Sequence, residues 1–294
     1  MSAVTLDQLN AWEPHQFVAA LGGVYEHSPW VAEAVAAKRP FASLAALHDA
    51  MSLVVRTAGD ESKRALLNAH PDLAGKAARA DALTADSKDE QHSAGLDRLN
   101  DAEFEEFHRL NAAYHTRFGF PFIICVRRHG KESIFRQFEA RLRNDIATEF
   151  DTALTEVVRI AALRLDQHVS APDTLPVHGR LSTHVLDTHR GKPAEGVAFE
   201  LHMLSGSRAD LVIAGATNAD GRTDAPLIAG RPLPIGTYEL RFAVGDYFKA
   251  RGVTLSDPPF LDVVPLRFSI AEPEGHYHVP LVVTPWSYST YRGS

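Results

Sequence analysis

A change of texture near residue 170 constrains the fold of this chain more than any other feature of its sequence. Residues 1–170 hold 7 of the 19 glycines and 5 of the 17 prolines, whereas the shorter stretch 171–294 holds 12 of each. Glycine and proline interrupt regular elements and form turns, so the second stretch must consist of shorter elements than the first. A chain of 294 residues is also long enough for two domains. We therefore expect two hydrophobic cores, divided near residue 170.

The first stretch has the apolar spacing of amphipathic helices. Over residues 103–114 the large apolar side chains recur every three or four positions, and Gly119 and Pro121 end the pattern. Residues 145–168 repeat this spacing, with an apolar stripe and charged residues opposite it. We therefore expect residues 1–169 to form an all-α helical bundle.

The second stretch alternates apolar and polar residues over short runs, as strands with one buried face do. The clearest runs are Arg180–Leu186, Val197–Leu204, Tyr238–Val244 and Val279–Val283. Turn signals containing glycine or proline separate them, which favours a two-layer β-sandwich over residues 177–294. Residues 170–176 hold two prolines and little to bury, and are predicted to form the linker.

Composition excludes several classes of protein. The net charge of −7 is typical neither of a nucleic-acid-binding protein nor of a basic membrane-surface protein. The single cysteine, Cys125, cannot form an internal disulfide or a thiolate metal cluster. The first residues lack the pattern of a signal peptide, and the longest apolar run, 118–126, is too short to span a membrane. We therefore expect a cytoplasmic protein with no nucleic-acid or membrane partner.

A histidine at a predicted helix end is the first candidate site residue. Pro71 disfavours helical backbone at the residue before it, so a helix should stop at or just before His70. An imidazole there can face a cleft, but surface histidines at helix ends are also common. The residue alone does not decide between these readings.

A second candidate group opens another predicted helix. Ser87 and Glu90 have the spacing of a capping box, in which each side chain bonds the backbone of the other end of the turn. The neighbouring Gln91 and the small pair Ala94-Gly95 favour a different reading, because a carboxylate and a carboxamide beside a close approach can hold a polar ligand. Both readings stay open at this point.

An apolar aromatic segment, residues 117–126, follows the next helix stop. It is a core element or a pocket wall whose free backbone amides donate to a ligand. Arg164 interrupts the apolar stripe of the last predicted helix. Such an arginine pairs with a carboxylate or extends to solvent, unless an anionic ligand needs a bidentate donor.

Three motifs together resemble a known family. HPDLAGK at 70–76, SxxEQxxAGL at 87–96 and FGFPFI at 118–123 resemble 2-oxo-4-hydroxy-4-carboxy-5-ureidoimidazoline (OHCU) decarboxylase, and the resemblance covers roughly residues 5–168. It implies an all-helical enzyme of urate breakdown, without cofactor, that removes CO₂ from OHCU and yields (S)-allantoin. It implies that His70 and Glu90 transfer protons. The substrate-binding residues implied are Pro71, Ser87, Gln91, the backbone of Phe122, Ile123, Ile124, Cys125 and Val126, and Arg164, with Arg159 as the competing candidate for holding the substrate's charge.

The second stretch contains a histidine pair with several possible roles. His276 and His278 stand two apart in a predicted strand and should project from the same face. With a distant histidine such as His184 they could ligate zinc, act as acids and bases, or simply be exposed. Arg222 follows an Asp-Gly turn and would ordinarily be a surface residue. The C-terminal segment would ordinarily be frayed, but its tyrosines make it unusually aromatic.

These residues belong to a second resemblance, which covers about residues 177–294. STHVLD at 182–187, GKPA at 191–194, DGR at 220–222, GDYF at 245–248, HYHVPL at 276–281 and YSTYRGS at 288–294 resemble 5-hydroxyisourate hydrolase, the transthyretin-related enzyme. The resemblance implies a transthyretin-like sandwich, a tetramer formed through this domain, and a reaction that needs no metal. The residues that it places in the active site are His184, Arg222, His278 and Tyr291, with Ser294 binding substrate and His276 adjacent.

The two implied reactions are consecutive. The C-terminal domain would hydrolyse 5-hydroxyisourate to OHCU, and the N-terminal domain would decarboxylate OHCU to (S)-allantoin, so the expected partners are these two small molecules and other copies of the chain. Dimer contacts through the N-terminal domain are a further expectation. The alternative is a non-catalytic transthyretin-like ligand-binding protein with a helical partner domain. The motif residues His184, Arg222 and His278 favour the enzyme.

Overall fold

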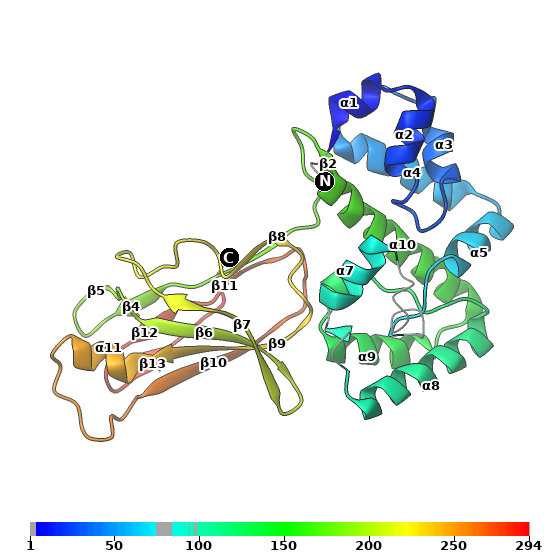
Figure 1. The fold of residues 1–294 in the computed structure, drawn as a ribbon. Coiled ribbons are helices and arrows are strands. Elements are labelled where there is room, and N and C mark those ends of the chain that lie inside the picture. The colour runs from blue at the N-terminus through cyan, green and yellow to red at the C-terminus, as the bar shows by residue number, and fades with distance from the viewer. Residues whose placement is uncertain (1–3, 75–83, 94, 97–98, 294) are drawn as a thin grey trace. The chain divides into compact units, whose positions relative to one another are not determined.

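The computed structural model describes residues 4–74, 84–93, 95–96 and 99–293, in two compact units (Figure 1). Unit 1 comprises Met1–Arg127 and Ser133–Pro176, and unit 2 comprises Arg128–Glu132 and Val177–Ser294. Within the described residues, no helix is long and apolar enough to cross a membrane.

Unit 1 is helical, as predicted from its apolar spacing. Its elements are α1 (Leu6–Ala11), α2 (Pro14–Leu21), α3 (Trp30–Ala36), α4 (Leu44–Thr57), α5 (Asp60–Asn68), α7 (Ala85–Ser93), α8 (Asp101–Phe118), α9 (Lys131–Arg141) and α10 (Ile146–His168), with a 3₁₀ turn, η2 (Val126–Arg128). The long helix α10 packs against α4, α5 and α8 and so runs through the bundle (Figure 1).

Local signals in the sequence set the ends of the two predicted helices. Asn100 and Glu103 form a reciprocal capping box at the start of α8, and Gly119 ends the helix with a left-handed φ of 75°. Asp145 caps α10 by accepting from the Thr148 amide at 2.9 Å. The apolar stripes of both helices are buried, which confirms the sequence-based reading.

Residues 169–173 are tied to the helical unit. Strand β2 (Val169–Ser170) pairs in parallel with β1 (Val4–Thr5) near the chain's beginning. The Asp173 carboxylate accepts from the amides of Leu44 and Ala45 at 2.8 and 3.0 Å, at the start of α4. This part of the predicted linker is thus held by hydrogen bonds.

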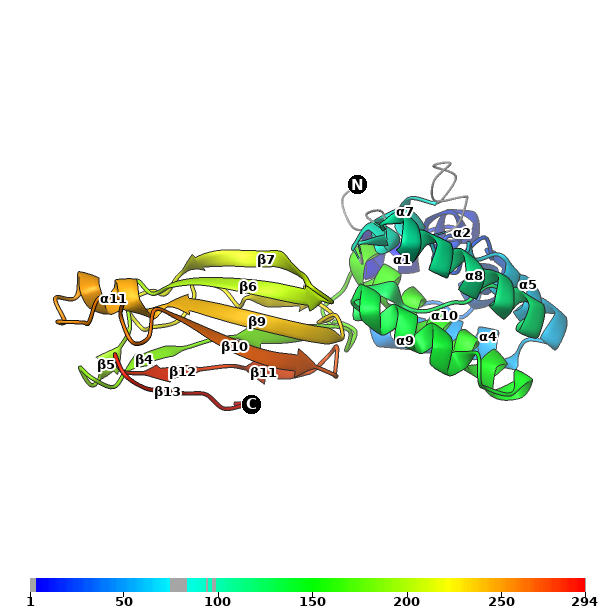
Figure 2. The ribbon, with the colours of Figure 1, turned by 90° about the horizontal axis from the view of Figure 1, so that it is seen from below.

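Unit 2 is a β-sandwich whose two layers are visible in Figure 2. One layer has the strand order β10-β9-β6-β7, and the other consists of β11-β3-β8 and β13-β12-β4-β5. The strands are β3 (Gly179–Ser182), β4 (Val185–Asp187), β5 (Lys192–Pro193), β6 (Ala198–Ser205), β7 (Arg208–Ala216), β8 (Ile228–Arg231), β9 (Gly236–Ala243), β10 (Val263–Ile270), β11 (His276–His278), β12 (Leu281–Val283) and β13 (Tyr288–Ser289). Inward-facing apolar side chains, including Leu201, Leu240, Phe242 and Leu281, form the core.

One local prediction for this unit was wrong. The run 180–186 is not one strand, because the chain leaves β3, which pairs with β11 and β8, and enters β4, which pairs with β12 and β5. His184 lies at this break. A helix, α11 (Val244–Ala250), follows β9 directly, so the unit is not purely β; its buried Tyr247 and Phe248 join the sandwich core.

Candidate active sites

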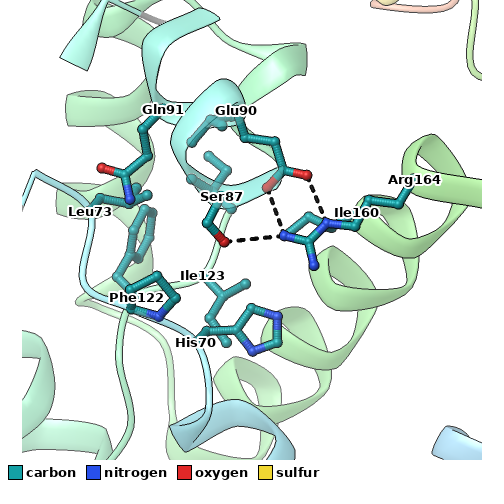
Figure 3. Close-up of a pocket in the computed structure, with 12 residues that line it drawn as sticks. His70, Leu73, Ser87, Glu90, Gln91, Phe122, Ile123, Ile160 and Arg164 are labelled. Atoms are coloured by element: carbon teal, nitrogen blue, oxygen red, sulfur yellow. Dashed lines mark hydrogen bonds and ion pairs between the residues drawn. The ribbon is translucent and has the colours of Figure 1, made fainter. Parts of the chain in front are cut away.

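Unit 1 contains a pocket built from four separate segments (Figure 3). It encloses about 360 Å³ of space, part of it open to solvent. The end of α5, helix α7, the segment after α8 and helix α10 each contribute to the wall. The lining residues are His70, Pro71, Leu73, Ser87, Glu90, Gln91, Phe122, Ile123, Ile124, Val126, Ile160 and Arg164. The structure therefore brings together almost all the residues that the first resemblance implied, although Leu73 and Ile160 were not foreseen.

His70 is held at the pocket in one orientation. Helix α5 ends at Asn68, as the His-Pro pair predicted, and the imidazole turns back so that Nδ1 lies 2.9 Å from the Leu66 carbonyl oxygen. A carbonyl only accepts, so Nδ1 carries the proton and neutral His70 keeps the lone pair of Nε2. Burial lowers the pKa of His70 to about 4, although the Leu66 carbonyl and Glu26 act in the opposite direction. His70 is therefore a neutral imidazole at neutral pH.

Arg164 lies on α10 between two carboxylates. Its Nε and Nη2 donate to the two Glu90 oxygens at 2.9 and 3.0 Å, and Nη1 lies 2.8 Å from Glu26 Oε2. Ser87 Oγ accepts from Nη2 at 3.3 Å and donates to Glu26 at 3.0 Å. The residue is 2% exposed. Its guanidinium is therefore engaged by protein groups, as expected for a buried arginine paired with carboxylates.

Glu26 is the charged residue of this site that sequence reasoning missed. It stands in the loop between α2 and α3 and reaches Arg164 only through the fold. The one available signal is a glutamate directly after the apolar pair Val24-Tyr25, four residues before the start of α3 at Trp30.

The pKa values of the two carboxyl groups around Arg164 are shifted in opposite directions. Burial raises the pKa of Glu90, and the bonds from Arg164 only partly offset this. Burial also acts to raise the pKa of Glu26, but the charge and hydrogen bonds of Arg164, with the bond from Thr84, bring it below its usual range. Glu26 is therefore the ionised partner of Arg164, and Glu90 is the carboxyl group better suited to carry a proton.

The capping-box reading of Ser87 and Glu90 was wrong. Helix α7 begins at Ala85, so Ser87 lies inside its first turn rather than before it. The Ser87 amide points to Thr84 Oγ1 at 3.3 Å, and the side chains of Ser87 and Glu90 turn to Arg164 instead of the helix backbone. Tertiary ion pairs thus replace the local cap.

Gln91 and helix α8 fix the loop after His70. The Gln91 carboxamide oxygen accepts from the Ala74 amide at 3.0 Å, and Asn111 on α8 donates to the Leu73 carbonyl at 2.9 Å. Ala74 has a left-handed φ of 50°, which these bonds stabilise. Gln91 lines the pocket, but part of its hydrogen-bonding capacity holds this loop.

The aromatic wall of the pocket is supported from behind. Arg141 lies over the Phe122 ring at 4.5 Å and donates to the Ile123 carbonyl at 2.8 Å, and the buried Glu149 holds Arg141 in turn. The Cys125 amide donates to Glu156 at 2.8 Å, and Cys125 is not among the described lining residues. Of the predicted backbone stretch, Phe122, Ile123, Ile124 and Val126 line the pocket.

Arg159, the alternative to Arg164, lies elsewhere on α10. It forms an ion pair with Glu156, and 46% of its side chain is exposed. It is not among the described residues that line the pocket. Arg164 is therefore the α10 arginine at the site.

Unit 2 gathers its candidate residues around the break between β3 and β4. His184 forms an isolated bridge with Arg222, and the His184 carbonyl accepts from the Leu281 amide at 2.8 Å. His278, on β11, forms a bridge with Gly293, and its Nδ1 lies 3.0 Å from Ser182 Oγ. Segments far apart in the sequence thus come together at the break between β3 and β4.

The pKa values of His184 and His278 are shifted by burial and by the charges of their neighbours. Burial, followed by the charge of Arg222, lowers the pKa of His184. Burial and then the charges of Arg222, His184 and His276 lower the pKa of His278. His184 Nε2 is buried and has no hydrogen-bond partner among the described residues. The cluster therefore contains two imidazoles that favour the neutral form beside a permanent cation.

The alternation in β11 and the ordered tail also follow the sequence. His276 and His278 flank the buried Tyr277, which confirms that they share a face. The C-terminal segment is not frayed: β13 pairs with β12, and Gly293 exchanges backbone hydrogen bonds with His278. Tyr291 is 59% exposed, and the predicted contact of Ser294 lies outside the described residues.

The proposed zinc ligands do not form a metal site in this geometry. Across the described part of the chain, no group of three histidine, cysteine, aspartate or glutamate side chains is placed to hold a metal ion. The alternative of a zinc site at His184, His276 and His278 therefore has no geometric support here.

A buried acid–base pocket in a helical unit and an imidazole–guanidinium cluster in a sandwich together define a two-domain enzyme acting on small molecules. Comparison with known families identifies both parts. Residues 10–166 match the OHCU decarboxylase family, and residues 181–293 match the HIUase/Transthyretin family. The chain belongs to both families.

Individual relatives match each half closely. The 5-hydroxyisourate hydrolase of Deinococcus radiodurans is 62% identical over 117 residues, which are 40% of this chain and 98% of that protein. The 2-oxo-4-hydroxy-4-carboxy-5-ureidoimidazoline decarboxylase of Haloferax volcanii is 44% identical over 171 residues, 58% of this chain and 99% of that protein. A crystal structure of (S)-allantoin synthase is 39% identical, with a TM-score of 0.52, and the match covers 99% of this chain and 100% of that one. The similarity therefore extends through both units.

Proposed function

We propose that this chain carries out two consecutive steps of urate degradation. Unit 2 hydrolyses 5-hydroxyisourate to OHCU, and unit 1 decarboxylates OHCU to (S)-allantoin. The observation that carries the proposal is the match of each half to a relative of that activity, together with a 39% identical (S)-allantoin synthase that spans the whole chain. For domain boundaries we propose residues 1–169 and 177–294, joined by 170–176.

The pocket of unit 1 supplies the groups that decarboxylation requires. The bond between the ring carbon and the carboxylate breaks, CO₂ leaves, and the electron pair passes into the carbon–nitrogen system of the imidazoline ring. The hydroxyl on that carbon then loses its proton to become a carbonyl, while the neighbouring ring carbon and the ring nitrogen gain protons. This sequence needs an acceptor and a donor in fixed positions, and the ring itself accepts the electrons.

His70 and Glu90 suit these two roles. The Leu66 carbonyl fixes the His70 tautomer, so that Nε2 is free to accept the hydroxyl proton and then to pass it to the ring nitrogen. Glu90, with its raised pKa, delivers a proton to the ring carbon from one face, which sets the (S) configuration. Ser87, Gln91, Pro71 and the backbone of Phe122–Val126 bind the ureido and ring groups.

Arg164 acts in this proposal mainly through Glu90. Its fork is bonded to Glu90 and Glu26, and Phe122, Ile123 and Ile160 form an apolar part of the same wall. We therefore place the substrate's departing carboxylate against that apolar part in this proposal. Loss of CO₂ removes charge from that carboxylate, and an apolar surface opposes charge more than it opposes the neutral product. This placement favours the decarboxylated state.

Hydrolysis in unit 2 follows from its cluster of two histidines and an arginine. Water attacks a ring carbonyl carbon of 5-hydroxyisourate, a carbon–oxygen bond forms, the ring carbon–nitrogen bond breaks, and the nitrogen takes a proton. His184 and His278, held neutral by burial and Arg222, accept the water proton and return it. Arg222 stabilises the negative charge that develops on oxygen.

For the C-terminal segment we propose a role at the interface of a homotetramer formed through unit 2. Trp286, Tyr288 and Tyr291 are 57%, 45% and 59% exposed in the single chain. Exposed aromatic side chains grouped on one segment are typical of surfaces that another protein covers. Tyr291 and Ser294 would then complete the active site next to a second copy. A chain with a single cysteine, the buried Cys125, suits a reducing compartment such as the cytoplasm.

The proposal is tested by making 5-hydroxyisourate in place from urate with urate oxidase and following absorbance and circular dichroism together. The full chain should accelerate the decay of both 5-hydroxyisourate and OHCU and yield optically active allantoin. EDTA should leave both rates unchanged. If neither decay is faster than in buffer, the enzymatic function is refuted.

A further inference from the structure

Glu26 is a buried carboxylate with an unusually complete set of partners. It is 2% exposed, and its oxygens contact Arg164 Nη1 at 2.8 Å, Ser87 Oγ at 3.0 Å and Thr84 Oγ1 at 2.9 Å. His27 Nε2 lies 3.8 Å away. A carboxylate is removed from water in this way only when cations and hydrogen-bond donors replace its hydration.

The same guanidinium bonds the proposed proton donor. Nε and Nη2 of Arg164 donate to Glu90, while Nη1 contacts Glu26, so the two carboxylates lie at different edges of one planar cation. Ser87 Oγ joins the two edges, because it accepts from Nη2 (Figure 3). It also donates to Glu26. Any movement of the guanidinium toward one carboxylate takes it away from the other.

We propose that Glu26 is a positioning residue of the unit 1 site, which shares Arg164 with Glu90 and thereby keeps the arginine from neutralising Glu90 completely. The inference rests on the proposed decarboxylase function. Among the described lining residues, the Glu26 oxygens bond Ser87 and Arg164, and through Arg164 the carboxylate acts on Glu90. Its negative charge and its hold on Nη1 both make Glu90 a better proton carrier.

Other charged groups face Glu90 as well, and none of them duplicates this effect. Arg164 on α10 and Arg127 on η2 favour its ionised form, while Glu26 disfavours it. His70 faces Glu26 and Arg164 across the pocket, and His27 lies on the other side of Glu26. Glu26 is thus the described carboxylate that opposes the two arginines at Glu90.

The direct test is a titration of Glu90 in the full chain. Carbon-13 NMR of carboxyl-labelled glutamate would follow the Glu90 signal, assigned by its loss in Glu90→Gln. In Glu26→Gln the amide can keep the bonds to Ser87 and Arg164 but not the charge. The Glu90 midpoint should then fall by about one pH unit or more, the usual size of a neighbouring-charge effect. An unmoved midpoint in folded Glu26→Gln overturns the proposal.

Thr84→Val provides the matched control. It removes the Thr84 hydroxyl bond to Glu26 at 2.9 Å and the acceptor of the Ser87 amide, but it leaves the Glu26 charge and the Arg164 ion pair in place. The Glu90 midpoint should stay within a few tenths of a unit of its wild-type value. An equally large shift in this control would assign the effect to general loosening and would also overturn the proposal.

If Glu26→Gln fails to fold, Glu26→Asp replaces it. The shorter side chain keeps the charge but withdraws it from Nη1, so a smaller downward shift of Glu90 is expected, and no shift refutes the inference. In the rate profile of OHCU decay, Glu26→Gln should move the limb that belongs to Glu90 to lower pH. Because the titration needs no turnover, a wild-type chain that does not decarboxylate OHCU would refute the proposed function separately.

Discussion

Replacing Arg164 with methionine tests the electrostatic design of the unit 1 site most directly. The change keeps an unbranched side chain of similar length but removes the cation that contacts both Glu26 and Glu90. Arg164 is 2% exposed, so water cannot replace the lost contacts without opening the pocket. Two buried carboxylates would remain without their shared partner.

The expected loss of stability is large. Removing one member of a buried ion pair costs about 3–5 kcal/mol, chiefly because the remaining charge is left buried without a counter-charge. Arg164 serves two carboxylates, so we expect the upper part of that range at neutral pH. OHCU decarboxylation should be lost as well, because Glu90 is no longer held in the pocket.

The loss should depend on pH with a definite sign. In the wild type the lowered pKa of Glu26 contributes stability above its unfolded pKa, and this is lost as pH falls through the folded pKa. In Arg164→Met the charge and hydrogen bonds of Arg164 no longer oppose burial, and only weaker effects such as the Thr84 bond remain, so the folded pKa of Glu26 should rise. The variant then gains stability relative to its neutral-pH value as the carboxyls become protonated. The difference between the two proteins should therefore shrink toward about pH 5 and below.

Urea denaturation followed by far-ultraviolet circular dichroism, in which helical unit 1 dominates the signal, measures this difference. The matched control is Arg159→Met, on the same helix, where 46% of the side chain is exposed and the partner is three residues away. Glu156 is buried, but the half-exposed Arg159 leaves the pair open to solvent screening, so we expect a loss of about 1 kcal/mol. Equal losses in the two variants, or a loss in Arg164→Met that does not change with pH, would refute the reasoning.

Three further predictions concern single residues. His70→Ala should abolish OHCU decarboxylation and the optical activity of the allantoin while 5-hydroxyisourate decay stays fast. In the wild type, the pH–rate profile of decarboxylation should show a limb at the His70 pKa of about 4. A limb near the ordinary histidine pKa would contradict the buried neutral state. Gly221→Ala should destabilise unit 2 by more than about 1 kcal/mol and slow hydrolysis, because φ is +69° and a Cβ would meet the Val185 carbonyl oxygen at 2.3 Å. Gly230→Ala has the same φ but no atom within 4 Å, so it should lower the free energy of unfolding by less. Equal unfolding midpoints in the two variants would argue against the clash. Arg222→Gln should raise the pKa of His184, since the Arg222 charge, together with burial, lowers it. The acid limb of the pH–rate profile of hydrolysis should therefore move to higher pH. An unchanged limb would show that the Arg222 charge does not act on this histidine.

Much of the fold could be predicted because the controlling signals are local. Asn100, Glu103 and Gly119 set the ends of α8 through their own backbone contacts, and apolar spacing chose its buried face. The strand break at His184 could not be predicted this way. It exists because β3 and β4 pair with different neighbours, and an alternating pattern carries no information about which strands lie beside it.

The candidate sites divide in the same manner. The motifs around His70, Glu90, His184 and His278 indicated the candidate site residues and the chemistry expected of them, because a short motif specifies residue types at a given spacing. They could not indicate what Ser87 and Glu90 bond to. A local cap and a tertiary ion pair use the same side chains, and the buried cation of Arg164 is the stronger partner.

The sequence by itself determined that the chain has a helical and a β-rich part, and which family each part resembles. Periodicity, turn residues and motifs are properties of neighbouring residues, so they can be read without coordinates. Only the tertiary structure decided that Arg164 bonds Glu26 and Glu90, and that the Arg222 charge acts on His184 and His278. Burial and the distances between charges arise when distant segments come together, and these two quantities set the charge state of each candidate catalytic group.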